Sequence, residues 1–298
     1  MITTNKHKLP EIVVKTLQTD HYSRGNSDIS VTQLIDAPQV VVLQNKHDDE
    51  MERDISELIW PTLGTSLHHL FQETAEKQGD DVVSEERLFV DVEGWKISGA
   101  IDLQQIEDDG VIISDYKMTS VWSVIFDKSE WHKQLNAYAW LVRKAKGLKV
   151  KELRIIAALR DWQRRKAETE ESYPDSPIVV VKIPLWSNDD QDKYINDRVS
   201  LHQKAVFEEM TSGALPYCDS DERWQKETKF AVMKKGRARA IRLHSSKEEA
   251  TEQVEYLGKD HYIEDRVGEA TRCTQNWCGV ADWCDQYRQS NETKGDLS

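Results

Sequence analysis

The stretch ISDYKMTS, residues 113–120, places an acid and a lysine two residues apart at the end of an apolar run. The residues before it, DDGVII at 108–113, are typical of a turn that leads into a strand. Residues i and i+2 of a strand point to the same face, so Asp115 and Lys117 are expected to project together. Such a pair is either a solvated strand end or half of a metal site, and the surrounding sequence decides between them.

Composition limits the classes of protein. The chain has 298 residues, of which 38% are hydrophobic and 31% charged, as in a large globular protein. Its apolar runs, such as PIVVVKIPLW at 177–186, are too short to span a bilayer, and its first ten residues lack the apolar stretch of a signal peptide. A soluble intracellular protein without a membrane partner is expected. The net charge of −13 means that any contact with nucleic acid must use local basic patches.

The pattern of elements predicts an α/β fold. Helices are expected over 62–77, 129–146 and 189–213, the last two ending at Gly147 and Gly213, and Ser30 is a candidate cap for a helix that turns into an extended piece before residue 47. Strands are expected within 86–106, joined at Glu93-Gly94, and over 110–117, 152–162 and 176–186. The order helix, three strands, helix, strand predicts helices packed on a sheet. We expect three parts: a polar N-terminal segment (1–27), a core (28–213) and a C-terminal extension (214–298).

A second acid precedes the opening stretch by thirteen residues. Asp102 lies in SGAIDL, and the Asp108-Asp109-Gly110 turn joins its strand to that of Asp115. If the strands are neighbours, the two carboxylates converge, repel each other and raise each other's pKa. A divalent cation removes that conflict and favours oxygen ligands. Gly99 would permit a close backbone approach at the same place.

Further motifs flank these strands in order along the chain. They are G-x-x-x-H at Gly64 and His68, G-x-x-D at Gly99 and Asp102, D-x-K at Asp115 and Lys117, and Q-x-x-x-Y at Gln134 and Tyr138. The set resembles the RecB-type branch of the PD-(D/E)XK nucleases over residues 60–185. The chain is also similar to a phage-encoded subgroup in the stretches SVTQLIDAP, SVWSVIF, LRDWQ and KFAVMKKGRARAIR. The broader relatives of this subgroup include the CRISPR-associated RecB-like exonucleases and the nuclease domain of AddB. The implied fold is a mixed central sheet flanked by helices.

The resemblance implies metal-dependent hydrolysis of DNA phosphodiesters, as an exonuclease at DNA ends in phage recombination, replication or end processing. It implies that Mg²⁺ or Mn²⁺ is held by His68, Asp102, Asp115 and the carbonyl of Tyr116, and that the catalytic residues are Asp102, Asp115, Lys117, Gln134 and Tyr138. Glu86 stands where many relatives carry a further acid. A non-catalytic DNA-binding or assembly factor that keeps the fold, and an endonuclease, are the alternatives.

Four cysteines form a second constellation after the core. Cys273, Cys278 and Cys284 follow a C-x4-C-x5-C pattern, and Cys218 lies upstream. Four thiolates favour a [4Fe-4S] cluster, with a structural zinc as the next alternative and four free thiols as the last. Iron–sulfur relatives share the last interval. Their first cysteine usually precedes the nuclease motifs and their first short gap is usually two residues, and this chain departs from both features.

The most basic run of the chain lies in the C-terminal extension, within 229–242. Lys234, Lys235, Arg237 and Arg239 are its candidate phosphate contacts, and alternation along a hairpin would put Arg237 and Arg239 on one face. The alternative is a solvated hairpin.

Trp122 and Trp162 are candidates for stacking on a frayed base. The expected partners are DNA ends or single strands and a single-strand annealing or replication protein. The expected location is the cytoplasm, that of the host cell if a phage encodes the chain.

Overall fold

The chain divides into two compact units. The computed structural model describes residues 2–19, 25–275 and 277–295, without the side chains of 291–295, so parts of the expected N-terminal segment and C-terminal extension lie outside the described residues. The first unit comprises residues 1–38 and 47–213, and the second comprises 39–46 and 214–298. Within the described part of the chain, none of the helices combines the length and the apolar character needed to cross a membrane.

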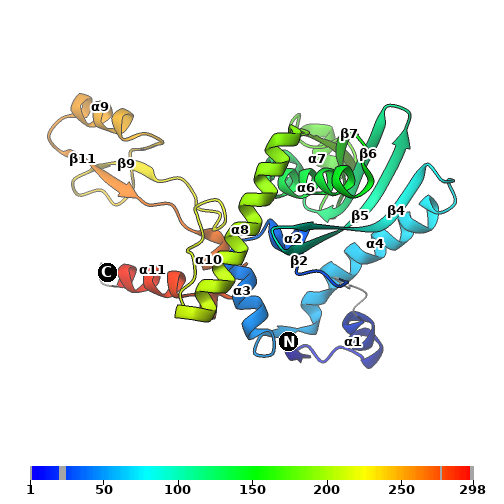
Figure 1. Cartoon of the computed structure of the whole chain (residues 1–298). Coiled ribbons are helices and arrows are strands. Elements are labelled where there is room, and N and C mark those ends of the chain that lie inside the picture. The colour runs from blue at the N-terminus through cyan, green and yellow to red at the C-terminus, as the bar shows by residue number, and fades with distance from the viewer. Residues whose placement is uncertain (1, 20–24, 276, 296–298) are drawn as a thin grey trace. The chain divides into compact units, whose positions relative to one another are not determined.

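A mixed six-stranded sheet forms the centre of the first unit (Figure 1). Its strands are β2 (Ile29–Ser30), β4 (Val82–Val92), β5 (Trp95–Glu107), β6 (Gly110–Thr119), β7 (Val150–Leu159) and β8 (Ile178–Ile183). The order is β2-β5-β6-β7-β8, with β4 also paired to β5. Strands β6 and β7 are parallel, whereas β4/β5, β5/β6 and β7/β8 are antiparallel. The expected α/β class with a mixed sheet is confirmed.

Two helices cover the sheet from opposite sides, with β5 between them in Figure 1. Helix α4 (Ile59–Ala75) contacts β4, β5 and β6, and helix α6 (Ser129–Lys146) contacts β4 to β8. The long helix α8 (Asn188–Ser212) packs against α6. Pro61 falls in the first turn of α4, where its missing N–H costs nothing. Gly147 and Gly213 end α6 and α8 in the left-handed conformation, as predicted.

Local sequence explains the hairpin that positions the sheet. Glu93 and Gly94 have φ of 49° and 81°, so both central residues of the turn adopt the left-handed conformation that favours tight hairpins. The predicted β4–β5 hairpin is therefore confirmed. Its apolar side chains join those of α6 and the inner strands in one core, which includes Ile97, Ile101 and Leu141.

Gly99 sets how closely α6 approaches β5. A Cβ atom at this position would lie 2.7 Å from Cδ1 of Leu141 and 2.9 Å from Cε1 of Tyr138, both on α6. Such distances are well inside van der Waals contact, so only glycine allows this packing. The close approach that the sequence predicted at Gly99 is thus made by a helix.

The segment after Ser30 differs from its prediction. Ser30 caps a helix, α2 (Val31–Leu34), with a reciprocal capping box to Gln33, but the expected extended piece is a second helix, α3 (Pro38–His47). Val40, Val41 and Leu43 of α3 are buried, so tertiary packing overrides the strand propensity of its valines. The rest of the first unit comprises β1 (Ile2–Thr4), α1 (Glu11–Gln18), β3 (Glu52–Asp54), the 3₁₀ turn η1 (Ile55–Leu58), α5 (Trp122–Ile125) and α7 (Arg164–Thr169).

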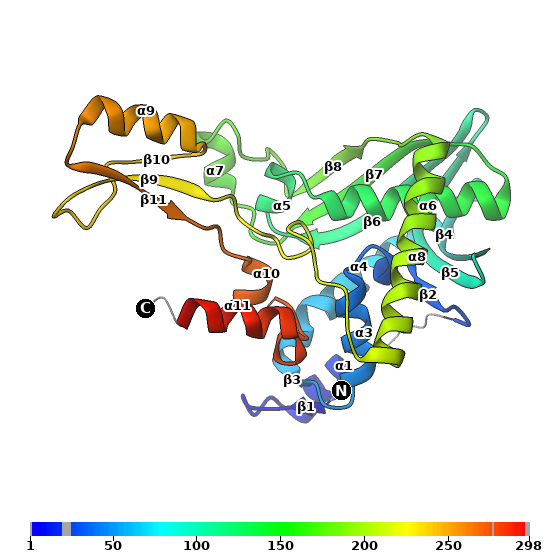
Figure 2. The ribbon, with the colours of Figure 1, turned by 60° about the vertical axis from the view of Figure 1, so that its left-hand side comes forward.

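The second unit is built around a three-stranded antiparallel sheet of order β10-β9-β11. Its strands are β9 (Lys229–Lys234), β10 (Arg242–His244) and β11 (His261–Arg266), and helix α9 (Lys247–Leu257) lies along the sheet (Figure 2). The side chain of Ser246 accepts the N–H of Glu249 and so caps the start of α9. Helices α10 (Thr271–Thr274) and α11 (Asp285–Gly295) and the 3₁₀ turn η2 (Ala281–Trp283) complete the unit with α3.

Replacing Gly99 with alanine should lower the free energy of unfolding by about 1–3 kcal/mol, because a packed side chain on α6 must give way. Denaturant unfolding followed by circular dichroism measures the change. Gly64→Ala is the matched control: nothing lies within 4 Å of a Cβ at Gly64 in the middle of α4, so the substitution should raise stability by about 0.5–1 kcal/mol. Equal effects of the two substitutions would contradict the close packing at Gly99.

Candidate metal centre

Asp102 and Asp115 meet where β5 and β6 stop pairing. Leu103 and Ser114 are the last paired residues, and the two aspartates lie one position beyond them. Both carboxylates are buried, with 6% and 1% of their residue surface exposed. The N–H of Tyr116 donates to Oδ2 of Asp102 at 2.7 Å, which holds this carboxylate against β6. The convergence expected from the turn between the two strands is therefore present.

Burial and mutual repulsion dominate the electrostatics of this pair. Burial raises the pKa of Asp102 to about 7, and the charge of Asp115 acts in the same direction. Nζ of Lys117 lies 2.6 Å from Oδ2 of Asp115. Burial alone would lower the pKa of Lys117, but Asp115 and Asp102 raise it above its ordinary value. The lysine is therefore held as a cation beside two carboxylates.

His68 approaches the same carboxylates from α4. Its Nε2 lies 3.2 Å from the carbonyl oxygen of Tyr116, and its Nδ1 lies 3.2 Å from Oε1 of Glu85 and 3.5 Å from Oδ1 of Asp102. Burial lowers the pKa of His68, but the hydrogen bond that the ring donates to Glu85 and the charge of Asp102 more than compensate, so the net shift is upward. One ligand atom from each of His68, Glu85 and Asp102 lies within 4.8 Å of the others.

Glu85 is the residue of this cluster that sequence reasoning missed. It lies on β4 with φ of 50°, a left-handed conformation within a strand. The acid expected there, Glu86, instead accepts from Nζ of Lys146 and Nε2 of Gln104, both at 2.7 Å. Strand alternation alone cannot identify Glu85, because its left-handed backbone interrupts the alternation of side chains along β4. The sequence signal that could have found it is the pair of acids Glu85-Glu86 on the strand opposite G-x-x-D.

Gln134 and Tyr138 hold the Asp115 carboxylate. Nε2 of Gln134 donates to Oδ1 of Asp115 at 3.2 Å and to the hydroxyl of Tyr138 at 2.9 Å. Both residues lie on α6 and are buried, four positions apart on one face. The Q-x-x-x-Y motif thus orients an acid through the same helix that packs on Gly99.

The donor set fits a divalent cation. Oδ2 of Asp115 is buried, and within the part of the chain that the structure describes its one polar partner is the ammonium of Lys117. Three carboxylates, from Glu85, Asp102 and Asp115, oppose one lysine, so an excess of two negative charges is left when His68 is neutral. Carboxylate oxygens with a backbone carbonyl are the ligands of Mg²⁺ and Mn²⁺, and one imidazole nitrogen is compatible with Mn²⁺.

The four cysteines gather in the second unit, and none forms a disulfide. Burial raises the pKa of Cys218 to about 12, and the nearby Glu222, Cys284 and Cys278 add to this shift. Nε2 of Gln39, on α3, lies 3.1 Å from Sγ of Cys284 and 3.6 Å from Sγ of Cys218. Sequence reasoning missed this buried amide, because it lies 179 residues before Cys218. Among the described residues, no three cysteine sulfurs lie within 4.8 Å of one another.

The basic run of the second unit differs in detail from its prediction. Lys234 ends β9, but Lys235, Arg237 and Arg239 lie in the loop between β9 and β10, and all four are exposed. The expectation that Arg237 and Arg239 alternate onto one face of a hairpin is wrong, because neither residue is in a strand. The N–H of Lys235 donates to the carbonyl of Asp260, so the start of the loop is anchored.

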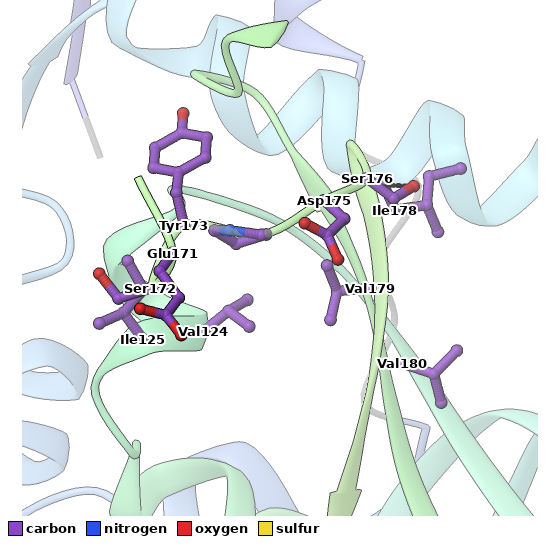
Figure 3. A pocket seen from close by; sticks show the side chains of 11 residues that line it. Val124, Ile125, Glu171, Ser172, Tyr173, Asp175, Ser176, Ile178, Val179 and Val180 are labelled. Carbon is purple, nitrogen blue, oxygen red and sulfur yellow. Dashed lines mark hydrogen bonds between the residues drawn. The ribbon is translucent and has the colours of Figure 1, made fainter. Parts of the chain in front are cut away.

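The two tryptophans singled out by the sequence have different surroundings. Nε1 of Trp162 donates to the carbonyl of Pro174 at 2.7 Å, and the ring packs against the core, so its role is structural. Trp122 is exposed. An open pocket of about 470 Å³ lies between α5 and the segment that leads into β8, lined by Val124, Tyr173 and Val179 among others (Figure 3). No member of the metal cluster lines this pocket.

Comparison with known proteins gives a family match. A family model described as the PD-(D/E)XK nuclease superfamily matches residues 42–285. No match was found among curated proteins.

Similar solved structures include SSO0001, with 21% identity and a TM-score of 0.43 over 64% of this chain and 85% of that one. An alkaline exonuclease from Laribacter hongkongensis has 12% identity and a TM-score of 0.37 over 62% and 94% of the two chains. A phage-related exonuclease from Haemophilus somnus 129PT has 18% identity and a TM-score of 0.32 over 51% and 74%.

Glu85→Gln should weaken Mn²⁺ binding by roughly tenfold or more, because it removes a charged oxygen from the cluster. Isothermal titration of the full-length chain with Mn²⁺ measures the affinity. Glu86→Gln is the matched control, because its carboxylate pairs with Lys146 and Gln104 and lies outside the cluster. A larger loss in the Glu86 variant than in the Glu85 variant would reverse the assignment of the two acids.

Proposed function

The chain belongs to the PD-(D/E)XK nuclease superfamily, and on that premise we propose that it is a metal-dependent exonuclease that hydrolyses phosphodiester bonds at DNA ends. The observation that carries the proposal is the convergence of two buried aspartates with a lysine, an imidazole and a further carboxylate at one point of the sheet. The preference for ends follows from the resemblance of the Gly64–His68 motif to the RecB-type branch. The corresponding processes are phage recombination, replication or end processing.

Each side chain has a definite task in this proposal. Asp102, Asp115, Glu85, His68 and the carbonyl of Tyr116 would hold Mg²⁺ or Mn²⁺. When bound, the ion would lower the pKa of a water molecule and offset negative charge on the phosphate. Gln134 orients Asp115 by donating to Oδ1, while Oδ2 faces the ammonium group of Lys117. His68 contributes one nitrogen, which favours Mn²⁺ over Mg²⁺ in a comparison of the two ions.

Lys117 supplies a positive charge beside the two aspartates. Its ammonium group lies 2.6 Å from Asp115, and its pKa is raised, so it stays protonated near neutral pH. A protonated lysine cannot remove a proton from water. We therefore assign Lys117 to orienting the attacking water and neutralising the developing charge on the phosphate oxygens.

For the second unit we propose a [4Fe-4S] cluster held by Cys218, Cys273, Cys278 and Cys284. Four thiolates suit such a cluster, and the interval between Cys278 and Cys284 is the one that iron–sulfur relatives in this superfamily share. A tetrahedral zinc bound by the same four thiolates is the alternative. The amide of Gln39 would then donate to cluster-bound sulfurs, a contact that raises the reduction potential of such centres.

The exposed loop that carries Lys235, Arg237 and Arg239 is proposed to contact the DNA backbone. Such contacts add affinity without base preference. In the variant with serine at all three positions, the slope of log affinity against log salt should fall by about 0.9 for each lost contact with duplex DNA. An unchanged slope in the folded variant would make the loop an ordinary solvated surface.

Asp102→Ala and Asp115→Ala should each lower cleavage of end-labelled linear DNA in Mn²⁺ by several orders of magnitude, because each removes a central carboxylate. Lys117→Ala should retain Mn²⁺ binding and lose turnover. Circular DNA, incubated in parallel, should survive. Cleavage of the circle would identify an endonuclease, and DNA binding without any cleavage by the unmodified chain would identify a non-catalytic factor.

Anaerobically purified protein should be brown, with broad absorption near ~400 nm, as iron–thiolate chemistry requires. Gln39→Leu should shift the reduction potential of the cluster downward without removing the colour, because it deletes only hydrogen bonds to sulfur. Colourless protein with one stoichiometric zinc would select the zinc site instead, and four alkylatable thiols without metal would remove both.

A further inference from the structure

Aromatic and cationic side chains gather at the carboxyl ends of β6 and β7, outside the metal cluster. The guanidinium of Arg160, just after β7, lies 4.9 Å from the centre of the Trp60 ring at the start of α4. Half of the Trp60 surface is nevertheless exposed. The N–H of Arg160 donates to the carbonyl of Thr119, the last residue of β6. Trp60 is thus tied to the end of the strand that carries Asp115 and Lys117.

A second aromatic group follows directly on β6. The rings of Trp122 and Phe126 are stacked, with centroids 5.9 Å apart and planes 16° from parallel, and both are exposed. The short helix α5 that carries Trp122 is firmly held. The N–H of Val121 donates to Oδ1 of Asp161 at 2.8 Å, and the hydroxyl of Thr119 donates to that of Ser123. The two exposed, nearly parallel rings present flat faces on which a base can stack.

Positive charge accompanies these rings. Arg164 and Arg165 lie on α7, four and five residues after Arg160, and all three are exposed. Among the described residues, no carboxylate forms an ion pair with any of the three arginines, although the chain carries a net charge of −13. An arginine beside a flat ring, followed along the chain by two more exposed arginines, suits a polyanion with π-faces.

One face of α4 connects this surface to the metal cluster. Trp60, Gly64 and His68 are spaced i, i+4 and i+8, so they follow one line along the helix. The space above Gly64 is open, since a Cβ there would meet nothing within 4 Å. The helix backbone is therefore bare between an exposed aromatic ring and a metal ligand.

We propose that these residues form a track for the unpaired end of a DNA strand that leads to Asp115. Bases stack on Trp60 and on the Trp122–Phe126 pair, phosphates contact Arg160, Arg164 and Arg165, and the strand crosses the backbone at Gly64. A ring can stack fully only on an unpaired base, because a duplex covers its base faces. This inference rests on the proposed function and specifies its substrate as a single-stranded or frayed end.

The test measures binding apart from cleavage, with the full-length chain in a chelating buffer. Fluorescence anisotropy gives the affinities for a labelled oligothymidylate and for a blunt duplex closed by a loop at its far end. Trp60→Ala and Trp122→Ala should each weaken oligothymidylate binding by about tenfold and leave duplex binding within about twofold. Phe207→Ala, an equally exposed aromatic on α8, is the matched control and should change neither affinity.

Two further variants separate the parts of the track. Gly64→Leu should weaken oligothymidylate binding several-fold while thermal unfolding shows no loss of stability, because it obstructs the open backbone. The Arg164→Ser/Arg165→Ser variant should flatten the salt dependence for the single strand by about 0.7 for each lost contact.

The outcomes distinguish the two proposals. Unchanged oligothymidylate affinity in a folded Trp60→Ala/Trp122→Ala variant overturns the track, even if the unmodified chain cleaves DNA. Equal losses for oligothymidylate and duplex also overturn it, because the surface would then be a duplex interface. If the unmodified chain cleaves no DNA in Mn²⁺ but the selective loss of binding is found, the track stands and the nuclease proposal fails.

Discussion

The burial of two carboxylates side by side is the constraint on which the first unit depends. Asp102 and Asp115 lie beyond the last pair of an antiparallel ladder, and burial with mutual repulsion raises the pKa of Asp102 to about 7. Isolated charges of like sign cannot remain there at neutral pH. The N–H of Tyr116, the ammonium of Lys117 and the ring of His68 each offset part of this cost. All three come from the elements that the fold places nearest.

The same constraint explains the packing of α6. Gln134 can reach Oδ1 of Asp115 only because α6 lies close to β5, and that distance is set by the missing side chain at Gly99. Tyr138 serves twice, since its ring packs against Gly99 and its hydroxyl accepts from Gln134. Packing and charge placement are therefore not independent here. A change at Gly99 acts on the carboxylate through one helix.

Most of the first unit could be predicted because its signals are local. The turn at Glu93-Gly94 and the helix ends at Gly147 and Gly213 need only the conformational freedom of a few residues. The misses have non-local causes. Helix α3 contains four successive valine and leucine residues, a run that favours a strand, but it is packed as a helix in the second unit. With a left-handed backbone at Glu85, the acid that lies beside His68 and Asp102 is one position before the predicted Glu86. The predicted alternation of Arg237 and Arg239 also failed, because β9 ends at Lys234 and β10 begins only at Arg242.

The chain keeps two kinds of donor atom in two separate units. Carboxylates, a carbonyl and one imidazole lie in the first unit, and four sulfurs lie in the second. Hard oxygen ligands select Mg²⁺ and Mn²⁺, whereas thiolates select iron–sulfur centres and zinc. An imidazole beside carboxylates makes this separation less sharp, since zinc also binds such a set and binds it more tightly than Mn²⁺ does. The acidic neighbours of His68 raise its pKa, and this works against zinc binding, because a proton must leave the ring before its nitrogen can bind a metal. The acidic surroundings that would attract a divalent ion therefore also set a cost on using the imidazole nitrogen, so zinc would gain less from His68 than from a histidine with an ordinary pKa.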